Sequence, residues 1–271
     1  MRVSNASMLL DAGELDPAGI FVARAPDRLA GVQVCVPLRG SSGIFWLPQV
    51  AAAWRRTNLA ERLVQAAANW LRGRGAKLAQ ALVQAADLPQ AAPLKCCGFR
   101  HVTGLQYLRH DLSDLPAVPG PPELHYRPYA PDIEQTFQQT MLRTYEQTLD
   151  CPELNGIRTI EEIMDGHRAQ GIWRPENWWL ASLAGAPAGI VLLTQLGDVD
   201  GYDLSYVGVV PEYRRRGLGS AMALRAMQVA KDHDSLQLLL AVDQRNRPAR
   251  RLYQALGFDP TESREVLLLI Y

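Results

Sequence analysis

The sequence predicts an α/β (α+β) fold in which two similar units follow one another, each with a mixed sheet flanked by helices. Two observations lead to this prediction: the chain repeats itself at a fixed spacing, and strand-like and helix-like segments alternate along the better-preserved copy. The composition agrees, because 48% of the 271 residues are hydrophobic and 21% are charged, a balance typical of globular domains that bury a core.

The repeat emerges when the chain is shifted by 159 residues against itself. The aligned pairs include Trp54 with Tyr213, Arg55 with Arg214, Pro89 with Pro248 and Gly98-Phe99 with Gly257-Phe258. Because these pairs keep one register without a net gap, we interpret them as two copies of one unit. The copies are predicted at 1–112 and 124–271. Between them, a proline-rich linker at 113–123 can continue neither a helix nor a central strand.

The second copy begins with a strand and two helices. Residues 123–131 alternate in polarity and end at a proline, which predicts a strand. A helix is expected over 133–148 with Asp132 as its N-cap, and a second helix over 159–171, which Gly171 would end. Three strands are then expected, at 178–183, 188–195 and 202–210, with a turn at 184–187 between the first two.

The rest of the second copy alternates helix and strand. A helix follows Gly217-Leu218-Gly219, a β-rich run occupies 236–242, a helix spans 247–256 and a last strand spans 264–271. Gly257 stands where a helix C-cap is expected. The predicted order of elements is therefore βααβββαβαβ.

Charge and composition argue against several classes of protein. Lys and Arg together number 28, as do Asp and Glu, so the basic excess typical of a nucleic-acid binder is missing. No apolar run reaches the roughly 18 residues of a membrane helix, and the N-terminus lacks the apolar region of a secretion signal. The cysteines, at 35, 96, 97 and 151, lack the spacing of a zinc site, so we expect no metal and reduced thiols in the cytoplasm. The oligomeric state stays open.

Three arginines run directly into a glycine-rich helix start. The segment is Arg214-Arg215-Arg216-Gly217-Leu218-Gly219-Ser220. The first amides of a helix have no intrahelical partner and carry the positive end of the helix dipole, so phosphate binds well there. Glycine lets the backbone approach an anion closely, and arginine adds charge-assisted hydrogen bonds. The segment therefore indicates a pyrophosphate cradle, although a tight turn beside solvated arginines would use the same residues.

Two motifs of the second copy together resemble the GNAT superfamily of acetyl-CoA-dependent N-acetyltransferases. Arg214, Gly217 and Gly219 fill the Q/R-x-x-G-x-G/A signature of that family, after a strand and before a helix. The further matches, typical of a later segment in the family, are Asn246, Tyr253 and Gly257-Phe258. The resemblance covers 124–271 and implies a mixed, mostly antiparallel central sheet with CoA bound between two strands that splay apart. With the repeat, it implies two tandem GNAT-like domains.

The resemblance implies an acetyltransferase whose C-terminal domain moves an acetyl group from acetyl-CoA to a primary amine by direct attack in a ternary complex. The residues implied in cofactor binding are Val209, Val210, Arg214, Arg215, Arg216, Gly217, Leu218, Gly219, Ser220 and Asn246. Pantetheine would pair with the strand edge at Val209 and Val210, where a backbone amide would hold the thioester carbonyl. Two alternatives stay open: a longer acyl donor, and a non-catalytic CoA-binding regulatory or scaffold protein.

Two residues are implied in catalysis. Tyr253 would protonate the departing CoA thiolate, and Asp203, near the start of the strand at 202–210, would accept the amine proton. Each residue also has a plainer interpretation. Tyr253 also fits a packing tyrosine, Asp203 a strand-edge carboxylate in solvent, and Asn246 the N-cap of the helix that follows it.

The acceptor is expected to bind beside the first two helices of the second copy. Asp150 and Glu153 would hold an ammonium group there, and Tyr145 and Trp178 would form an aromatic wall. Taken singly, each of these residues also fits a surface charge or a packing aromatic. The sequence leaves open whether the acceptor is a small molecule or a peptide amine.

The first copy has lost key residues of the motif. Asn58 stands at the position of Gly217, and Leu94 at that of Tyr253. Asn can adopt a positive φ, but its side chain would crowd a phosphate, and Leu cannot donate a proton. We therefore expect a degenerate N-terminal copy that keeps the fold without acetyl transfer. A tandem with one working half resembles mycothiol synthase-like enzymes, an analogy that assigns no acceptor.

Overall fold

Contacts divide the chain into two compact units that interleave along the sequence. The computed structural model describes residues 15–117, 123–197 and 200–271. Unit 1 consists of Met1–Gly104, Gly156–Glu162 and Arg264–Tyr271, and unit 2 of Leu105–Asn155 and Ile163–Ser263. Part of the predicted linker, 118–122, lies outside the described residues. The boundaries 1–112, 113–123 and 124–271 therefore stay a prediction about the duplicated sequence units.

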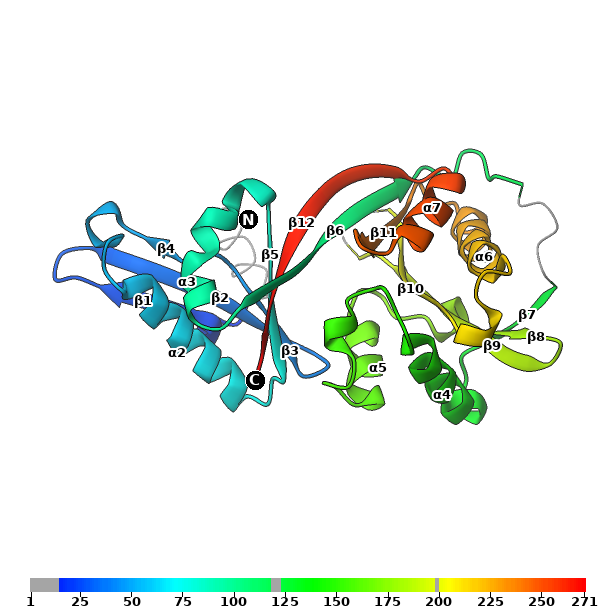
Figure 1. Cartoon of the computed structure of the whole chain (residues 1–271), viewed down its shortest axis with the longest axis horizontal. Helices are drawn as coiled ribbons and strands as arrows, with labels where there is room; N and C mark the ends of the chain where they lie inside the picture. Colours follow the sequence, from blue (N-terminus) through cyan, green and yellow to red (C-terminus); the bar gives the residue numbers. More distant parts are fainter. Residues whose placement is uncertain (1–14, 118–122, 198–199) are drawn as a thin grey trace. The chain divides into compact units, whose positions relative to one another are not determined.

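Unit 2 is built on a six-stranded sheet whose order in space is β7-β8-β9-β10-β11-β6 (Figure 1). Its strands are β6 Arg100–His110, β7 Leu124–Pro128, β8 Trp178–Leu183, β9 Ala186–Gln195, β10 Tyr202–Val209 and β11 Leu238–Asp243. Neighbours run antiparallel, except that β10 and β11 are parallel. The prediction of a mixed, mostly antiparallel sheet is confirmed.

Helices cover both faces of this sheet. They are α4 Glu134–Tyr145, α5 Ile160–Arg168, α6 Leu218–Asp232 and α7 Arg247–Ala255, so the predicted order βααβββαβαβ is confirmed. Figure 1 shows α4 and α6 on opposite sides of β8, β9 and β10. Strand alternation explains this: Val191 and Leu193 join the core that contains Met222 of α6. Within the described residues, no helix is both long and apolar enough to span a membrane.

Local capping sets the ends of several helices. Asp132 is not the N-cap of α4, because its carboxylate pairs with Arg127 and the cap position is Ile133. At α7, the Asn246 side chain accepts a hydrogen bond from the Ala249 amide, so the N-cap interpretation of Asn246 is confirmed. Gly257 has φ of +83° at the end of the same helix, as a C-cap requires.

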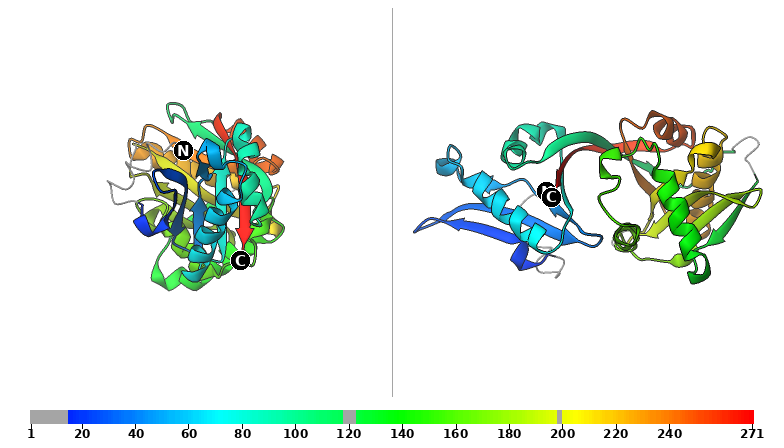
Figure 2. Two further views of the ribbon diagram at one scale, coloured as in Figure 1. Left: turned by 90° about the vertical axis from the view of Figure 1, so that its left-hand side faces the viewer. Right: turned by 60° about the horizontal axis from the view of Figure 1, so that its bottom comes forward.

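Unit 1 has a smaller sheet in the order β1-β2-β3-β5-β12. Its elements are β1 Ile20–Arg24, β2 Leu29–Leu38, β3 Ser42–Phe45, β4 Gln49–Val50, α2 Leu59–Gly73, β5 Leu78–Val83, α3 Ala92–Cys96 and β12 Asp259–Ile270. The right-hand view of Figure 2 shows α2 lying along β1 and β2. The buried face of α2, with Val64, Ala67 and Leu71, packs into a core with Phe45 and Leu94. Because α2 and α6 lie 159 residues apart at both ends, the structure follows the sequence repeat.

The last strand of each copy completes the sheet of the other unit. From the first copy, β6 pairs with β11 in unit 2, from Leu238↔His110 to Asp243↔Leu105. From the second copy, β12 pairs with β5 in unit 1, from Glu265↔Val83 to Ile270↔Leu78. Each sheet therefore contains one strand that belongs to the other copy by sequence.

Candidate functional site

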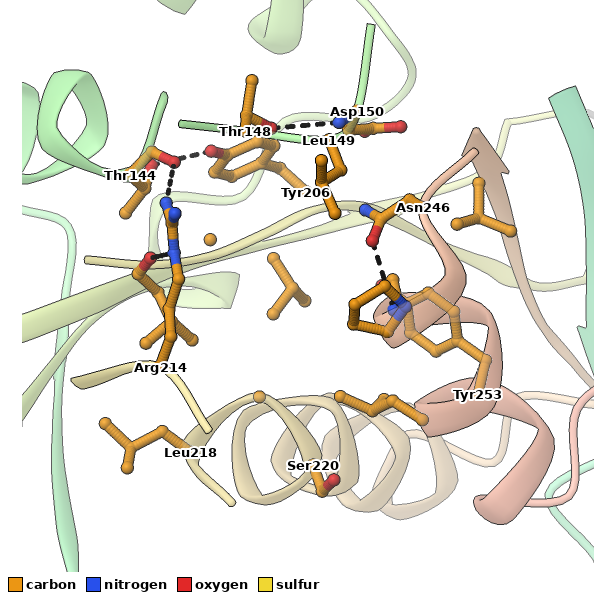
Figure 3. A pocket seen from close by; sticks show the side chains of 18 of the residues that line it. Thr144, Thr148, Leu149, Asp150, Tyr206, Arg214, Leu218, Ser220, Asn246 and Tyr253 are labelled. Carbon is orange, nitrogen blue, oxygen red and sulfur yellow. Dashed lines mark hydrogen bonds between the residues drawn. The ribbon is translucent and has the colours of Figure 1, made fainter. Parts of the chain in front are cut away.

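A cavity of about 710 Å³ lies in unit 2 where β10 and β11 diverge (Figure 3). The two strands pair at only two positions, Tyr202↔Leu238 and Asp203↔Leu239. Beyond them β10 continues to pair with β9 as far as Val209. One edge of β10 therefore has no strand partner over 204–209, and these residues line the cavity.

The exposed edge of β10 offers backbone groups to a ligand. Val210 donates its N–H to the Ala188 carbonyl at 3.0 Å, and neighbouring residues of a strand point their amides to opposite edges. The amides of Val207 and Val209 therefore face the cavity. Val210 does not line it, and its side chain is fully buried. The position of Val210 therefore does not support the prediction that it contacts the cofactor. Val209 lines the cavity as predicted, and Val207 also lines it although the sequence did not predict this.

The start of α6 forms the other side of the cavity. Gly217 is the N-cap residue, with φ of +81° and no side chain to bond the first amides. Arg215 also has a positive φ, +64°. The first-turn amides of Leu218, Gly219 and Ser220 therefore stay available to a ligand at the positive end of the helix dipole. All five of the predicted residues Arg215, Gly217, Leu218, Gly219 and Ser220 line the cavity.

The two neighbouring arginines have other contacts. The guanidinium of Arg216 lies 5.5 Å from the ring centre of Tyr213, and Arg216 is not a lining residue. Arg214 lines the cavity, but its Nε donates to the Val209 carbonyl at 2.9 Å. Its remaining donors bond the carbonyls of Thr144 (3.0 Å), Glu146 (2.7 Å) and Gln147 (3.2 Å). Arg214 therefore ties the end of α4 to β10, and its guanidinium is not aimed at an anion.

Tyr253 on α7 and Asn246 at its N-cap lie at the opposite end of the cavity from Arg214, as Figure 3 shows. Burial raises the pKa of Tyr253, and the negative charges of Asp150 and then Asp203 raise it further. The phenol therefore keeps its proton at neutral pH and can donate it. Since the Asn246 oxygen caps α7, only its amide nitrogen remains for a ligand.

Asp203 does not line the cavity. Its Oδ2 accepts a hydrogen bond from the Ser205 hydroxyl at 2.8 Å, and Ser205 is itself a lining residue. Burial raises the pKa of Asp203, and the Ser205 hydrogen bond opposes that shift. Ser205 is also the extra residue of a β-bulge, because Leu204 and Tyr206 pair with consecutive residues of β9. Any contact of Asp203 with a substrate would have to be indirect.

Of the four residues predicted to contact the acceptor, Asp150 lines the cavity. Glu153 instead forms a two-pronged ion pair with Arg245, at 2.7 and 2.9 Å. The Tyr145 ring packs edge-on against Tyr206, 5.5 Å between centres. Trp178 is 1% exposed and is stacked on Phe137 in the core between α4 and the sheet. The predicted aromatic wall is therefore not formed by Trp178.

Several lining residues escaped the sequence reasoning. They are Thr144, Thr148, Leu149, Tyr206, Val207, Arg247 and Arg251. Arg247 and Arg251 are four residues apart on α7, a spacing that places both on one helix face and that was readable from the sequence. The others come from the last turn of α4, the loop after it and a bulged strand, where no periodic pattern signals which side chains face the cavity.

Comparisons with known proteins agree with this geometry. The sequence pattern of the acetyltransferase (GNAT) family matches residues 143–258. The mycothiol acetyltransferase of Thermobifida fusca (strain YX) is 32% identical over 235 residues, which cover 79% of this chain and 71% of that protein.

Solved structures share the fold. A GCN5-related N-acetyltransferase from Sphaerobacter thermophilus superposes with a TM-score of 0.64 at 21% identity, over 98% of this chain and 85% of that one. A tandem GNAT protein from the clavulanic acid biosynthesis pathway gives 0.54 at 17% identity, over 94% and 85%. The tandem architecture expected from the repeat therefore has a solved counterpart.

Proposed function

The chain belongs to the GNAT family of acetyltransferases, and from this premise we propose that the cavity of unit 2 binds acetyl-CoA and presents its thioester to the primary amine of a small molecule. Acetyltransferases of this family take the acetyl group from acetyl-CoA. One observation carries the proposal: the unpaired edge of β10, the uncapped start of α6 and the Tyr253 phenol all line a single cavity.

The donor can occupy this cavity from end to end. Its diphosphate would accept hydrogen bonds from the amides of Leu218, Gly219 and Ser220, where the helix dipole favours negative charge. Its pantetheine arm would run along β10 and pair with the amides of Val207 and Val209, as an added strand does. One of these amides would also stabilise the oxyanion that develops on the thioester carbonyl.

The reaction needs a neutral amine and a proton for the leaving thiolate. The amine nitrogen attacks the thioester carbonyl carbon, so that a C–N bond forms and the C–S bond breaks. Tyr253 gives its proton to the CoA sulfur. The ammonium form of the acceptor loses two protons in all, one of which restores Tyr253 while the other leaves to solvent. Holding both substrates together supplies much of the acceleration through positioning.

The acceptor proposed first is a mycothiol-related amine. The support is the relative from Thermobifida fusca, which is named a mycothiol acetyltransferase and shares most of its length with this chain. An acceptor of that kind is a small molecule, which fits a cavity of about 710 Å³ shared with the donor. We place the reaction in the cytoplasm, since all four cysteines are unpaired thiols.

The test is an assay of CoA thiol release from acetyl-CoA. Desacetylated mycothiol, other small primary amines and peptides with a free N-terminus would be supplied in turn, and the acetylated products would be identified by mass spectrometry. We expect amine-dependent thiol release that is fastest with desacetylated mycothiol. Thiol release with peptides alone would overturn the proposed acceptor, and none with any amine would overturn the proposed function.

A further inference from the structure

We propose that Asp150, and not Asp203, is the catalytic carboxylate that binds the acceptor's ammonium group and takes its proton. This inference rests on the proposed function. It adds the identity of the base and requires that the acceptor enter the cavity as an ammonium ion, with the positive charge on the nitrogen that is acetylated. Asp150 lies in the loop between α4 and the short helix at Pro152–Leu154.

Position in the cavity favours Asp150 over Asp203. Asp150 lines the cavity together with Tyr206 and Tyr253, whereas Asp203 is not among the lining residues. Figure 3 shows Asp150 at the top of the view beside Thr148, and Tyr253 at the lower right. A base and an acid that serve one acyl transfer must both reach the reacting centre, and of these two carboxylates only Asp150 meets this condition.

The structure fixes the Asp150 carboxylate by contacts from β11. The Asp243 amide donates to Asp150 Oδ1 at 3.1 Å, and the next amide of the loop, that of Cys151, donates to Asp243 Oδ2 at 3.0 Å. Asp243 is fully buried, and the Arg245 guanidinium bonds it and Glu153 at the same time. The loop is therefore locked onto the end of β11 just after Asp150.

A second tie holds the start of the same loop. Arg214 bonds the carbonyls of Thr144, Glu146 and Gln147, which precede Asp150. With the loop fixed at both ends, the carboxylate is held in position before any ligand arrives. A catalytic base must be held in this way, because a small displacement of the base from the reacting atoms lowers the reaction rate strongly.

The charges around Asp150 suit it to accept a proton. Partial removal of water from around the Asp150 carboxylate raises its pKa, and the neighbouring carboxylate of Asp243 raises it further, whereas the hydrogen bond from the Asp243 amide and the charge of Arg245 lower it. A higher pKa makes the carboxylate a stronger base. Among the charges that raise the pKa of Tyr253, Asp150 contributes more than Asp203, so Asp150 is electrostatically closer to the proton donor.

The surroundings leave few other groups to titrate in the acid range. The titratable or charged residues that face Asp150 are Tyr206 from β10, Tyr253 from α7, Asp243 and Arg245 at the end of β11, and Cys151 in its own loop. Glu153 lies further along that loop and pairs with Arg245. Burial raises the pKa of both tyrosines and brings that of Cys151 to about 12. The Arg245 guanidinium lowers the pKa of Glu153, which stays ionised. We therefore expect kcat/KM for the amine to fall as the pH drops through the raised pKa of Asp150.

The test compares three Asp→Asn variants of the full chain, with a primary amine that the wild-type protein acetylates. We expect Asp150→Asn to lower kcat/KM for the amine by about 100-fold or more, to lose the acidic limb of the pH profile and to bind acetyl-CoA within about twofold of wild type by calorimetry. Asp203→Asn should keep the acidic limb and most of the activity. Asp234→Asn, an exposed aspartate after α6, is the matched control and should match wild type.

The opposite pattern would overturn the assignment. If Asp203→Asn removes the acidic limb while Asp150→Asn keeps it, the base is Asp203. If Asp150→Asn weakens acetyl-CoA binding as much as turnover, the residue supports the donor site and does not serve the amine. Absence of transfer by wild type with every amine would overturn this inference and the proposed function together, whereas equal transfer by wild type and Asp150→Asn would overturn this inference alone.

Discussion

The helices α2 of unit 1 and α6 of unit 2 begin after related sequences and yet have different N-termini. Both follow an arginine that bonds the carbonyl five residues earlier: Arg55 Nε reaches Val50 at 3.3 Å, and Arg214 Nε reaches Val209 at 2.9 Å. The approach to the helix is thus retained in both copies. The difference lies in the next three residues.

The N-cap residue of α6 is a glycine and that of α2 is an asparagine, and their φ angles have opposite signs. Gly217 has φ of +81°, whereas Asn58 has φ of −81°. At α2 the Thr57 hydroxyl accepts a hydrogen bond from the Leu59 amide at 3.3 Å, although the Asn58 side chain makes no capping hydrogen bond. One first-turn amide of α2 therefore has a side-chain partner, whereas Gly217 has no side chain that could serve the first amides of α6.

The two copies also differ at the position of the proposed acid. Leu94, the counterpart of Tyr253, is fully buried in the core of unit 1. A leucine contributes buried apolar area and has no proton to donate, as the predicted degenerate copy requires. The comparison teaches that a duplicated unit can keep its core while the residues at the predicted site change, since the helix faces that form the core are separate from the helix ends at the cavity.

Replacing Gly217 should give the largest effect and would break the comparison most directly. A Gly217→Val variant puts a β-branched residue at a left-handed φ, which costs about 1–2 kcal/mol, and places methyl groups where the diphosphate would lie. We expect acetyl-CoA binding to weaken by about 100-fold or more in calorimetry. The matched variant Asn58→Val should bind acetyl-CoA within about twofold of wild type. Equal losses in both variants would disprove a donor site confined to unit 2.

Removing the Tyr253 hydroxyl should have a smaller effect that is confined to turnover. We expect Tyr253→Phe to slow acetyl transfer by about 10²- to 10⁴-fold, with the acetyl-CoA dissociation constant unchanged. Because burial raises the pKa of Tyr253, the phenol should stay protonated through neutral and mildly alkaline pH in wild type. Tyr126→Phe, on β7 outside the cavity lining, is the control. Wild-type turnover in the Tyr253→Phe variant would rule out its acid role.

The arginine that both copies retain should show the smallest of the three effects. Arg214→Gln loses charge-assisted bonds to the end of α4, so the loop that carries Asp150 should loosen and kcat/KM for the amine should fall by about tenfold. Arg55→Gln removes the corresponding bond to Val50 and should leave transfer kinetics unchanged. If Arg214→Gln weakens acetyl-CoA binding more than it lowers kcat/KM for the amine, Arg214 contacts the donor instead.

The sequence by itself determined the order and type of the elements in the second copy. Most of these elements depend on local properties of the sequence, which act in the same way in the folded protein. Examples are the periodicity of strands and helices, the capping side chain of Asn246 and the positive φ of Gly257. The sequence also predicted an anion cradle at the start of α6, where Gly217 has the positive φ that glycine readily adopts. Asp132 is the local exception, since an ion pair with Arg127 was preferred to capping.

Only the tertiary structure decided which strands pair and which side chains reach the cavity. That β12 pairs with β5 and β6 with β11 depends on which strand edge is nearest in space, not on residues near in sequence. The choice of Val207 over Val210 follows from the pairing of β10 with β9, and the place of Asp150 follows from a loop tied to Asp243, 93 residues away. Such contacts join distant segments, so no local pattern in the chain encodes them.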